Sequence, residues 1–132
     1  MVKSAAGGAA EPMTSAAPPQ PAPAAALSFQ ERFAAIEREW KQQLPLRLQE
    51  ARTRMDACRA APGDRAGLED LHRLLHTLAG SAGTFGLADV GSGARAIEHE
   101  LDRVMALPAA GSADFDTADR ALQALAASVP GA

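Results

Sequence analysis

The sequence predicts an all-α fold, namely an antiparallel up-and-down four-helix bundle with an additional N-terminal helix. Apolar residues recur at intervals of three and four along the chain, and no segment alternates in the manner of a β-strand. Alanine and leucine dominate a hydrophobic content of 47%, while aromatic residues make up only 4%. The connections between the periodic segments are short, which makes successive helices antiparallel neighbours.

The first 27 residues differ in composition from the rest of the chain. They are rich in Ala, Pro, Gly and Ser, and they hold five of the nine prolines. Such a segment buries too little apolar surface to offset the entropy lost on ordering it. We therefore expect a disordered tail over residues 1–27 and a helical domain over residues 28–129.

The additional helix is expected to begin after Ser28, a suitable N-cap with Glu31 completing a capping box. Its apolar face consists of Phe29, Phe33, Ile36 and Trp40. The phase of the pattern then changes near Pro45, and proline suits the first turn of a helix better than its interior. A separate bundle helix is therefore expected from residue 45 to the Ala61-Pro62-Gly63 segment. Its stripe is Leu44, Leu48, Ala51, Met55 and Cys58.

Three further helices complete the predicted bundle. Asp64 is a good N-cap for the next one, and Gly86 is placed to end it. Its stripe is Leu68, Leu71, Leu75, Leu78, Ala82 and Phe85. The following stripe is Leu87, Val90, Ala94, Ile97, Leu101 and Val104, and it stops at Leu107-Pro108. After a turn at Gly111-Ser112, the last stripe is Phe115, Ala118, Leu122, Leu125 and Val129.

His76 lies on the side of its helix that faces away from the apolar stripe. At roughly 100° per residue, its side chain points about 140° from the centre of that stripe, so the imidazole should face solvent. Ala79, Gly80 and Gly83 lie beside it. Each glycine costs a helix about 1 kcal/mol relative to alanine. Small residues around an exposed histidine indicate that a large partner comes close to the ring.

The segment from His76 to Gly86 resembles the signature of the histidine-containing phosphotransfer (HPt) family, which reads roughly His-x-Leu-Lys-Gly-Ser-(Ala/Ser)-x-x-x-Gly. The matching residues are His76, Leu78, Gly80, Ser81, Ala82 and Gly86, and the helical pattern extends the resemblance over residues 28–129. The resemblance implies a phosphoryl carrier of a two-component phosphorelay rather than a kinase, with His76 as the phosphoacceptor.

The resemblance also implies the partners. His76 would accept the phosphoryl group from the aspartate of a response-regulator receiver domain, which can belong to a hybrid histidine kinase, and would pass it to another receiver. The receiver would supply the aspartate and the Mg²⁺, so no cofactor is expected on this chain.

One position departs from the family signature. Ala79 stands where the family usually has a lysine whose ammonium can meet the phosphoryl group. Arg73, one turn before His76, is the candidate replacement cation, although it can equally be an ordinary solvated arginine. His72 lies closer to the apolar stripe and either lines the site or marks the boundary of the core. The predicted docking face of this helix comprises Arg73, His76, Ala79, Gly80 and Gly83.

Composition narrows the classes of partner. The net charge is −3 and no basic run is present, which argues against nucleic acid. No apolar run approaches the roughly 18 residues of a membrane span, and glycines and Pro12 interrupt any signal-peptide core. We therefore expect a cytoplasmic protein without a membrane partner. No exposed coiled-coil seam is evident, so a monomer is expected.

Two other interpretations remain open. An HPt-like bundle could dock a partner without accepting phosphate, which the missing lysine allows. Alternatively, His72 and His76 could begin a metal site, because they are four residues apart and Glu69 with His72 forms a Glu-x-x-His motif. A second such motif and further ligands are missing from the sequence, which weakens the metal hypothesis.

Overall fold

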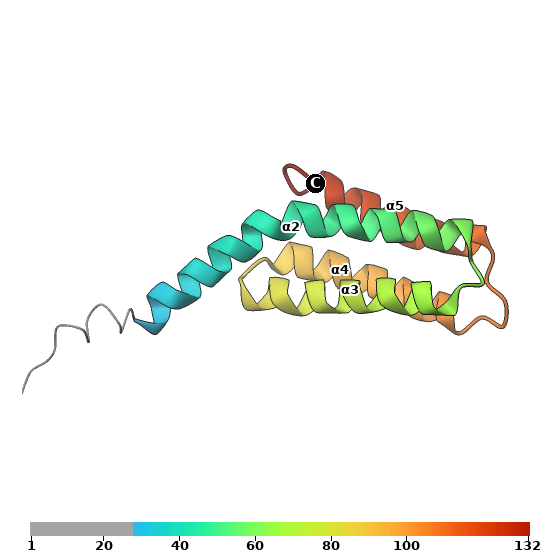
Figure 1. Cartoon of the computed structure of the whole chain (residues 1–132), viewed down its shortest axis with the longest axis horizontal. Helices are drawn as coiled ribbons and strands as arrows, with labels where there is room; N and C mark the ends of the chain where they lie inside the picture. The colour runs from blue at the N-terminus through green and yellow to red at the C-terminus, as the bar shows by residue number, and fades with distance from the viewer. Residues whose placement is uncertain (1–27) are drawn as a thin grey trace, which may run out of the picture. The chain divides into compact units, whose positions relative to one another are not determined.

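The computed structural model describes residues 28–132 of the chain, and this range is helical (Figure 1). Its elements are α2 (Phe29–Ala60), α3 (Arg65–Thr84), α4 (Ala88–Met105), the short 3-10 turn η2 (Ser112–Phe115) and α5 (Asp116–Ala127). Residues 28–132 contain no strand, which confirms the predicted all-α class. The tail predicted for residues 1–27 lies outside the described residues. The chain divides into two compact units between Glu39 and Trp40.

α2 is one continuous helix, so the prediction of two helices meeting at Pro45 is wrong. A proline inside a helix lacks the N–H that would bond to the preceding turn, at a cost of about 3 kcal/mol. Tertiary contacts offset this cost. Leu44 and Leu48, on either side of Pro45, are both buried in the core. The C-terminal turn also packs here, since Gln49 Nε2 donates to the carbonyl of Gly131 at 3.1 Å.

The first unit contributes the beginning of α2. The predicted capping box is present: the Ser28 N–H donates to the Glu31 carboxylate at 3.0 Å, and the Glu31 N–H donates to the Ser28 hydroxyl at 3.1 Å. Phe29 and Phe33 stack with their ring centroids 6.1 Å apart. Phe29 and Ile36 are nevertheless 73% and 57% exposed, so this predicted face is not a buried one.

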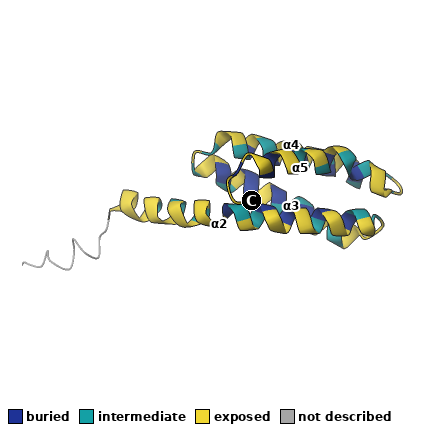
Figure 2. Ribbon diagram, turned by 90° about the horizontal axis from the view of Figure 1, so that it is seen from above, coloured by how far each residue is buried: buried dark blue, intermediate teal, exposed yellow. Residues whose placement is uncertain are grey.

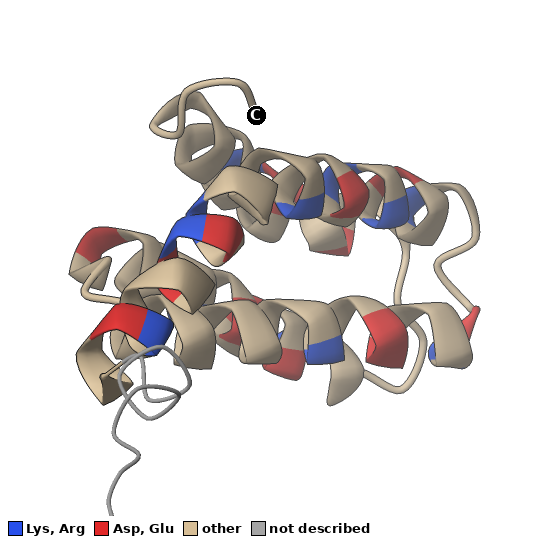
Figure 3. Cartoon of the chain, turned by 60° about the vertical axis from the view of Figure 1, so that its left-hand side comes forward, with Lys and Arg blue, Asp and Glu red and all other residues tan. Residues whose placement is uncertain are grey.

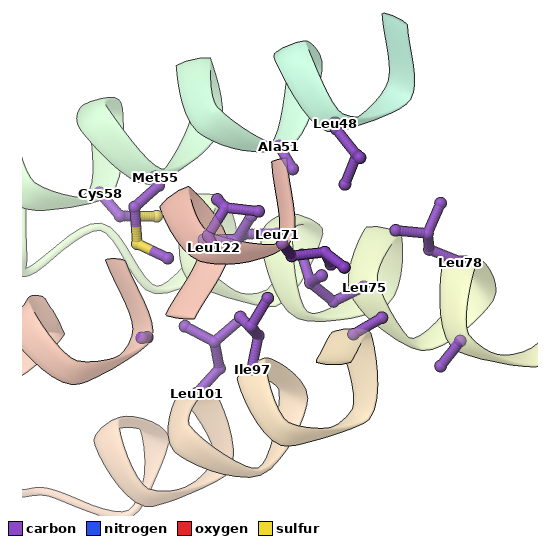
Figure 4. Packing of buried hydrophobic residues seen from close by; sticks show 14 of the residues in the cluster. Leu48, Ala51, Met55, Cys58, Leu71, Leu75, Leu78, Ile97, Leu101 and Leu122 are labelled. Atoms are coloured by element: carbon purple, nitrogen blue, oxygen red, sulfur yellow. The ribbon is translucent and has the colours of Figure 1, made fainter. Parts of the chain in front are cut away.

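The second unit, from Trp40 onward, is a bundle whose helices lie lengthwise side by side and turn their buried faces inward (Figure 2). Figure 4 shows how Leu48 and Met55 of α2, Leu71 and Leu75 of α3, Ile97 and Leu101 of α4, and Leu122 of α5 meet in one core. All stripe residues predicted from Leu44 to Cys58 and from Phe115 to Val129 are buried. Each buried leucine contributes about 1.5–3 kcal/mol, so the bundle rests on aliphatic packing.

Both ends of α3 are capped as the sequence predicts. The Asp64 carboxylate accepts the Gly67 N–H at 3.1 Å. At the other end, Gly86 adopts a left-handed φ of 75°. The Leu87 N–H donates to Ala82 at 2.9 Å and the Gly86 N–H donates to Gly83 at 3.4 Å, which is a Schellman motif. This short turn brings α4 back alongside α3.

Gly91 allows α3 and α4 to approach closely. It is buried, and a Cβ at this position would lie 3.3 Å from the Ala79 carbonyl oxygen and 3.6 Å from the Gly83 nitrogen. Because the helices are antiparallel, earlier residues of α3 face later residues of α4. This register places acidic side chains of α4 beside the two histidines of α3.

Charges of both signs are interspersed along the helices (Figure 3). The clearest interhelical ion pairs join Arg59 of α2 to Asp116 and Asp119 of α5, at 2.6 and 2.8 Å. None of the helices within residues 28–132 is long and apolar enough to cross a membrane.

Candidate functional site

His76 occupies the middle of α3, and 71% of its side chain is exposed. The flanking Leu75 and Leu78 are buried in the core, so the helix is anchored directly beneath the imidazole. The orientation expected from the helical periodicity is therefore present. The ring is held on a rigid element and is accessible to a partner.

Glu98 of α4 determines the orientation of this imidazole. Its Oε2 lies 2.7 Å from His76 Nδ1, and only 13% of the Glu98 side chain is exposed. An ionised carboxylate can only accept a hydrogen bond, so the shared hydrogen belongs to Nδ1. In the neutral imidazole the lone pair then resides on Nε2. With Glu98 as the acceptor, the ring therefore leaves its Nε2 lone pair unused by this contact.

His72 lies one turn before His76 and is closer to the core, with 23% of its side chain exposed. Its Nε2 is 2.7 Å from Asp102 Oδ1 and 3.7 Å from Glu98 Oε2. These distances suit an ion pair when the ring is protonated, although no group in residues 28–132 forms a well-directed hydrogen bond with this nitrogen. His72 therefore lines the site at the boundary of the core, with Glu98 between the two imidazoles.

These histidines and carboxylates do not form a metal-binding arrangement. Among residues 28–132, no group of three or more His, Cys, Asp or Glu side chains is placed to hold an ion. Instead, the Glu98 carboxylate of α4 holds Nδ1 of His76 in place, and Nε2 of the same ring makes no part of this contact.

Arg73, the cation suggested by the sequence, lies beside His76 but is engaged elsewhere. Its guanidinium pairs with Asp70 at 2.9 Å, one turn earlier on the same helix. Both side chains are largely exposed, and such pairs contribute about 0–1 kcal/mol. The two residues Arg73 and His76 border a hollow of about 450 Å³, which is completed by Glu69, His72, Glu98 and Met105.

Gly80 and Gly83 are exposed, as the predicted docking face requires. Within the described part of the chain, a Cβ at either position would meet nothing within 4 Å. Close packing against a neighbouring helix therefore does not explain these two glycines. That role belongs to Gly91 of α4, which the sequence did not single out.

Ala79 does not lie on the exposed face, so this part of the predicted docking face is wrong. The residue is only 2% exposed and belongs to the core cluster. The periodicity of α3 alone could not show this, because the burial of Ala79 results from the close approach of α4 at Gly91.

A second hollow, of about 300 Å³, lies on the other side of His76. Its lining consists of His76, Ala79, Gly80, Arg95, Glu98 and His99. Sequence reasoning missed both Glu98 and Arg95. The spacing of three and four between Arg95, Glu98 and Asp102 was the available signal, because it places them on one face of α4.

Comparison with known proteins gives one result that bears on this site. The family model described as Hpt domain matches residues 28–128, a range that includes all of the described helices. No curated protein and no solved structure matches the chain.

Proposed function

This chain belongs to the Hpt domain family, and from that premise we propose that it is a phosphorelay intermediate whose His76 carries a phosphoryl group between receiver-domain aspartates. Hpt domains are phosphocarrier modules of two-component signalling rather than kinases, and they work with response-regulator receiver domains. The observation that carries the assignment to His76 is its exposed ring, whose Nδ1 is fixed by Glu98 at 2.7 Å.

The hydrogen bond to Glu98 supports the proposed transfer chemistry. The Nε2 lone pair attacks the phosphorus of an aspartyl phosphate, so a P–N bond forms while the P–O bond to the aspartate breaks. The aspartate leaves as a carboxylate, and the imidazole ring gains positive charge. Because Nδ1 keeps its hydrogen throughout, no proton needs to move. The carboxylate of Glu98, which is mostly buried, stabilises the positive charge that develops on the ring. When a second aspartate attacks the phosphorus, the P–N bond breaks and the ring returns to its neutral form.

The two uncovered glycines support the approach of a receiver. Each costs α3 about 1 kcal/mol relative to alanine, and no residue between 28 and 132 makes a contact that uses the missing side chain. A partner whose loops come close to the Nε2 atom would use that space. The proposed docking face is therefore Arg73, His76, Gly80 and Gly83, with His72 lining its inner edge.

The remaining parts of the proposal concern the partner and the setting. The receiver, which can be part of a hybrid histidine kinase, provides the aspartate and the Mg²⁺, and the chain contributes the nucleophile. We propose that the protein acts as a monomer and meets these receivers in the cytoplasm.

A labelling experiment tests this proposal. The full chain is incubated with a phosphorylated receiver domain, and phosphate on the chain is assayed for acid lability and base stability. We expect the native protein to be labelled and His76→Gln to remain unlabelled. His99→Gln is the companion variant: His99 is another exposed histidine, which borders the hollow beside His76, and a chain that keeps His76 should still be labelled.

Two results would contradict the proposal. Labelling that persists in His76→Gln would place the phosphoacceptor elsewhere. A native protein that binds phosphorylated receivers but takes no phosphate would favour a docking module without phosphotransfer.

A further inference from the structure

Arg95 of α4 is a cation beside His76 whose charge no carboxylate neutralises within residues 28–132. The ion pairs nearest the site engage other arginines, with Arg73 bound to Asp70 and Arg103 bound to Glu100. Arg95 lines the 300 Å³ hollow together with His76 and Gly80. Its guanidinium is thus available to an anion that enters this hollow.

The register of the two helices places Arg95 on the correct side of the imidazole. Glu98 contacts His76, and Arg95 precedes Glu98 by three residues, so the two share one face of α4. Because α4 runs antiparallel to α3, Arg95 lies toward the C-terminal end of α3, where Gly80 follows His76. Among the described residues a Cβ at Gly80 would meet nothing within 4 Å, and Gly80 borders the same hollow as Arg95 and His76.

We propose that Arg95 takes the place of the missing signature lysine and contacts the phosphoryl oxygens on His76. This inference rests on the proposed function and adds a residue to it. A phosphoryl dianion on Nε2 would stand close to the negative charge of Glu98, so a nearby cation is needed to offset the repulsion. The guanidinium fork presents paired N–H groups that match phosphate oxygens, which makes arginine well suited to this contact.

The alternative cation is Arg73, on the opposite side of His76. It would have to release Asp70 before it could contact the phosphoryl group. The other titratable groups that border the two hollows are Glu69 and His72 on α3 and Glu98 and His99 on α4. Two arginines line the hollows. Arg73 is paired with Asp70, whereas Arg95 has no carboxylate partner among residues 28–132.

The test measures the pKa of the phosphoryl group on His76. The full chain is treated with phosphoramidate, a small phosphoryl donor. The P–N bond of the donor breaks, ammonia leaves, and a new P–N bond forms at Nε2. The ³¹P resonance of phosphohistidine is then followed against pH, and the signal of His76 is assigned by its absence in His76→Gln.

We expect Arg95→Ala to raise the pKa of the phosphoryl group by roughly 0.5 to 1, because loss of a cation disfavours the dianion. Because solvent screens charges at this exposed site, we expect a smaller change in the pKa than a buried arginine would cause. Arg95→Lys should restore most of the native value. Arg120→Ala is the matched control, since Arg120 is an exposed arginine of α5 that lines neither hollow.

Each outcome decides the inference. An unchanged pKa in Arg95→Ala, or an equal change in Arg120→Ala, overturns the role of Arg95. A pKa that moves only in Arg73→Ala assigns that role to Arg73 instead. Because a small donor replaces the receiver, these results do not depend on transfer from a receiver, which the labelling experiment tests separately. A native protein without a ³¹P signal from His76 counts against both proposals.

Discussion

Gly80 gives the sharpest test of the site, because a side chain there should change stability and function in opposite directions. Alanine is more favourable than glycine in a helix by about 0.8–1 kcal/mol. A Cβ at Gly80 meets no atom of the described helices within 4 Å, so no strain from them offsets this gain. Gly80→Ala should therefore stabilise the domain by nearly 1 kcal/mol. For a domain of about 100 residues this corresponds to a rise in Tm of roughly 4–8 °C.

The functional effect is expected to grow with the size of the new side chain. Gly80→Leu fills the space beside His76 that a receiver would enter. If overpacking there costs the complex about 1–3 kcal/mol, the rate of phosphoryl transfer falls roughly 5- to 150-fold. The assays are thermal unfolding followed by circular dichroism and the transfer rate from a phosphorylated receiver.

Ala124→Leu provides the matched control for added bulk, because Ala124 is exposed on α5. It should transfer phosphate at the native rate. A lower Tm in Gly80→Ala would show that the space is occupied in the folded chain. A native transfer rate in Gly80→Leu would refute the idea that the partner approaches over this glycine.

Three further predictions concern the surrounding residues. Gly91→Ala should lower the Tm, because its Cβ would lie 3.3 Å from a backbone oxygen of α3; a Tm at or above the native value would contradict the close approach. Glu98→Gln should slow phosphoryl transfer about fivefold, because the hydrogen bond to His76 loses its charge, which contributes about 1 kcal/mol at this exposed ring. Rapid-quench measurements of the transfer rate check this, and a native rate would contradict it. Burial is the main cause that raises the pKa of the Cys58 thiol above 9.0, and the nearby Asp64 raises it further. Arg54 lowers this pKa, but by less. The folded state therefore keeps its proton where the unfolded state loses it. This contribution to stability is fully present below pH 9 and declines above it, so urea unfolding between pH 8 and 10 should show a steeper loss for the native protein than for Cys58→Ala.

The helices from α3 onward were predictable because their signals are local. Asp64 and Gly86 mark the ends of α3, and the apolar stripes repeat at intervals that only a helix satisfies. The same local reasoning failed at Pro45. Its unfavourable effect on a helix is intrinsic, whereas the contacts that keep α2 continuous come from core residues and from the distant Gly131.

The site shows the same division between local and tertiary information. The exposure of His76 follows from its position on α3 alone. The contacts of Glu98 and Arg95 depend on the register of α3 against α4, which no single-helix pattern contains. The burial of Ala79 has the same origin, because the approach of α4 at Gly91 covers a residue that the helical wheel leaves open.

The imidazole, its carboxylate partner and the neighbouring arginine all belong to the hairpin formed by α3 and α4. The outward faces of α2 and α5 carry none of these groups. Substitutions at exposed positions of those two helices therefore leave the imidazole, its carboxylate partner and the neighbouring arginine unchanged.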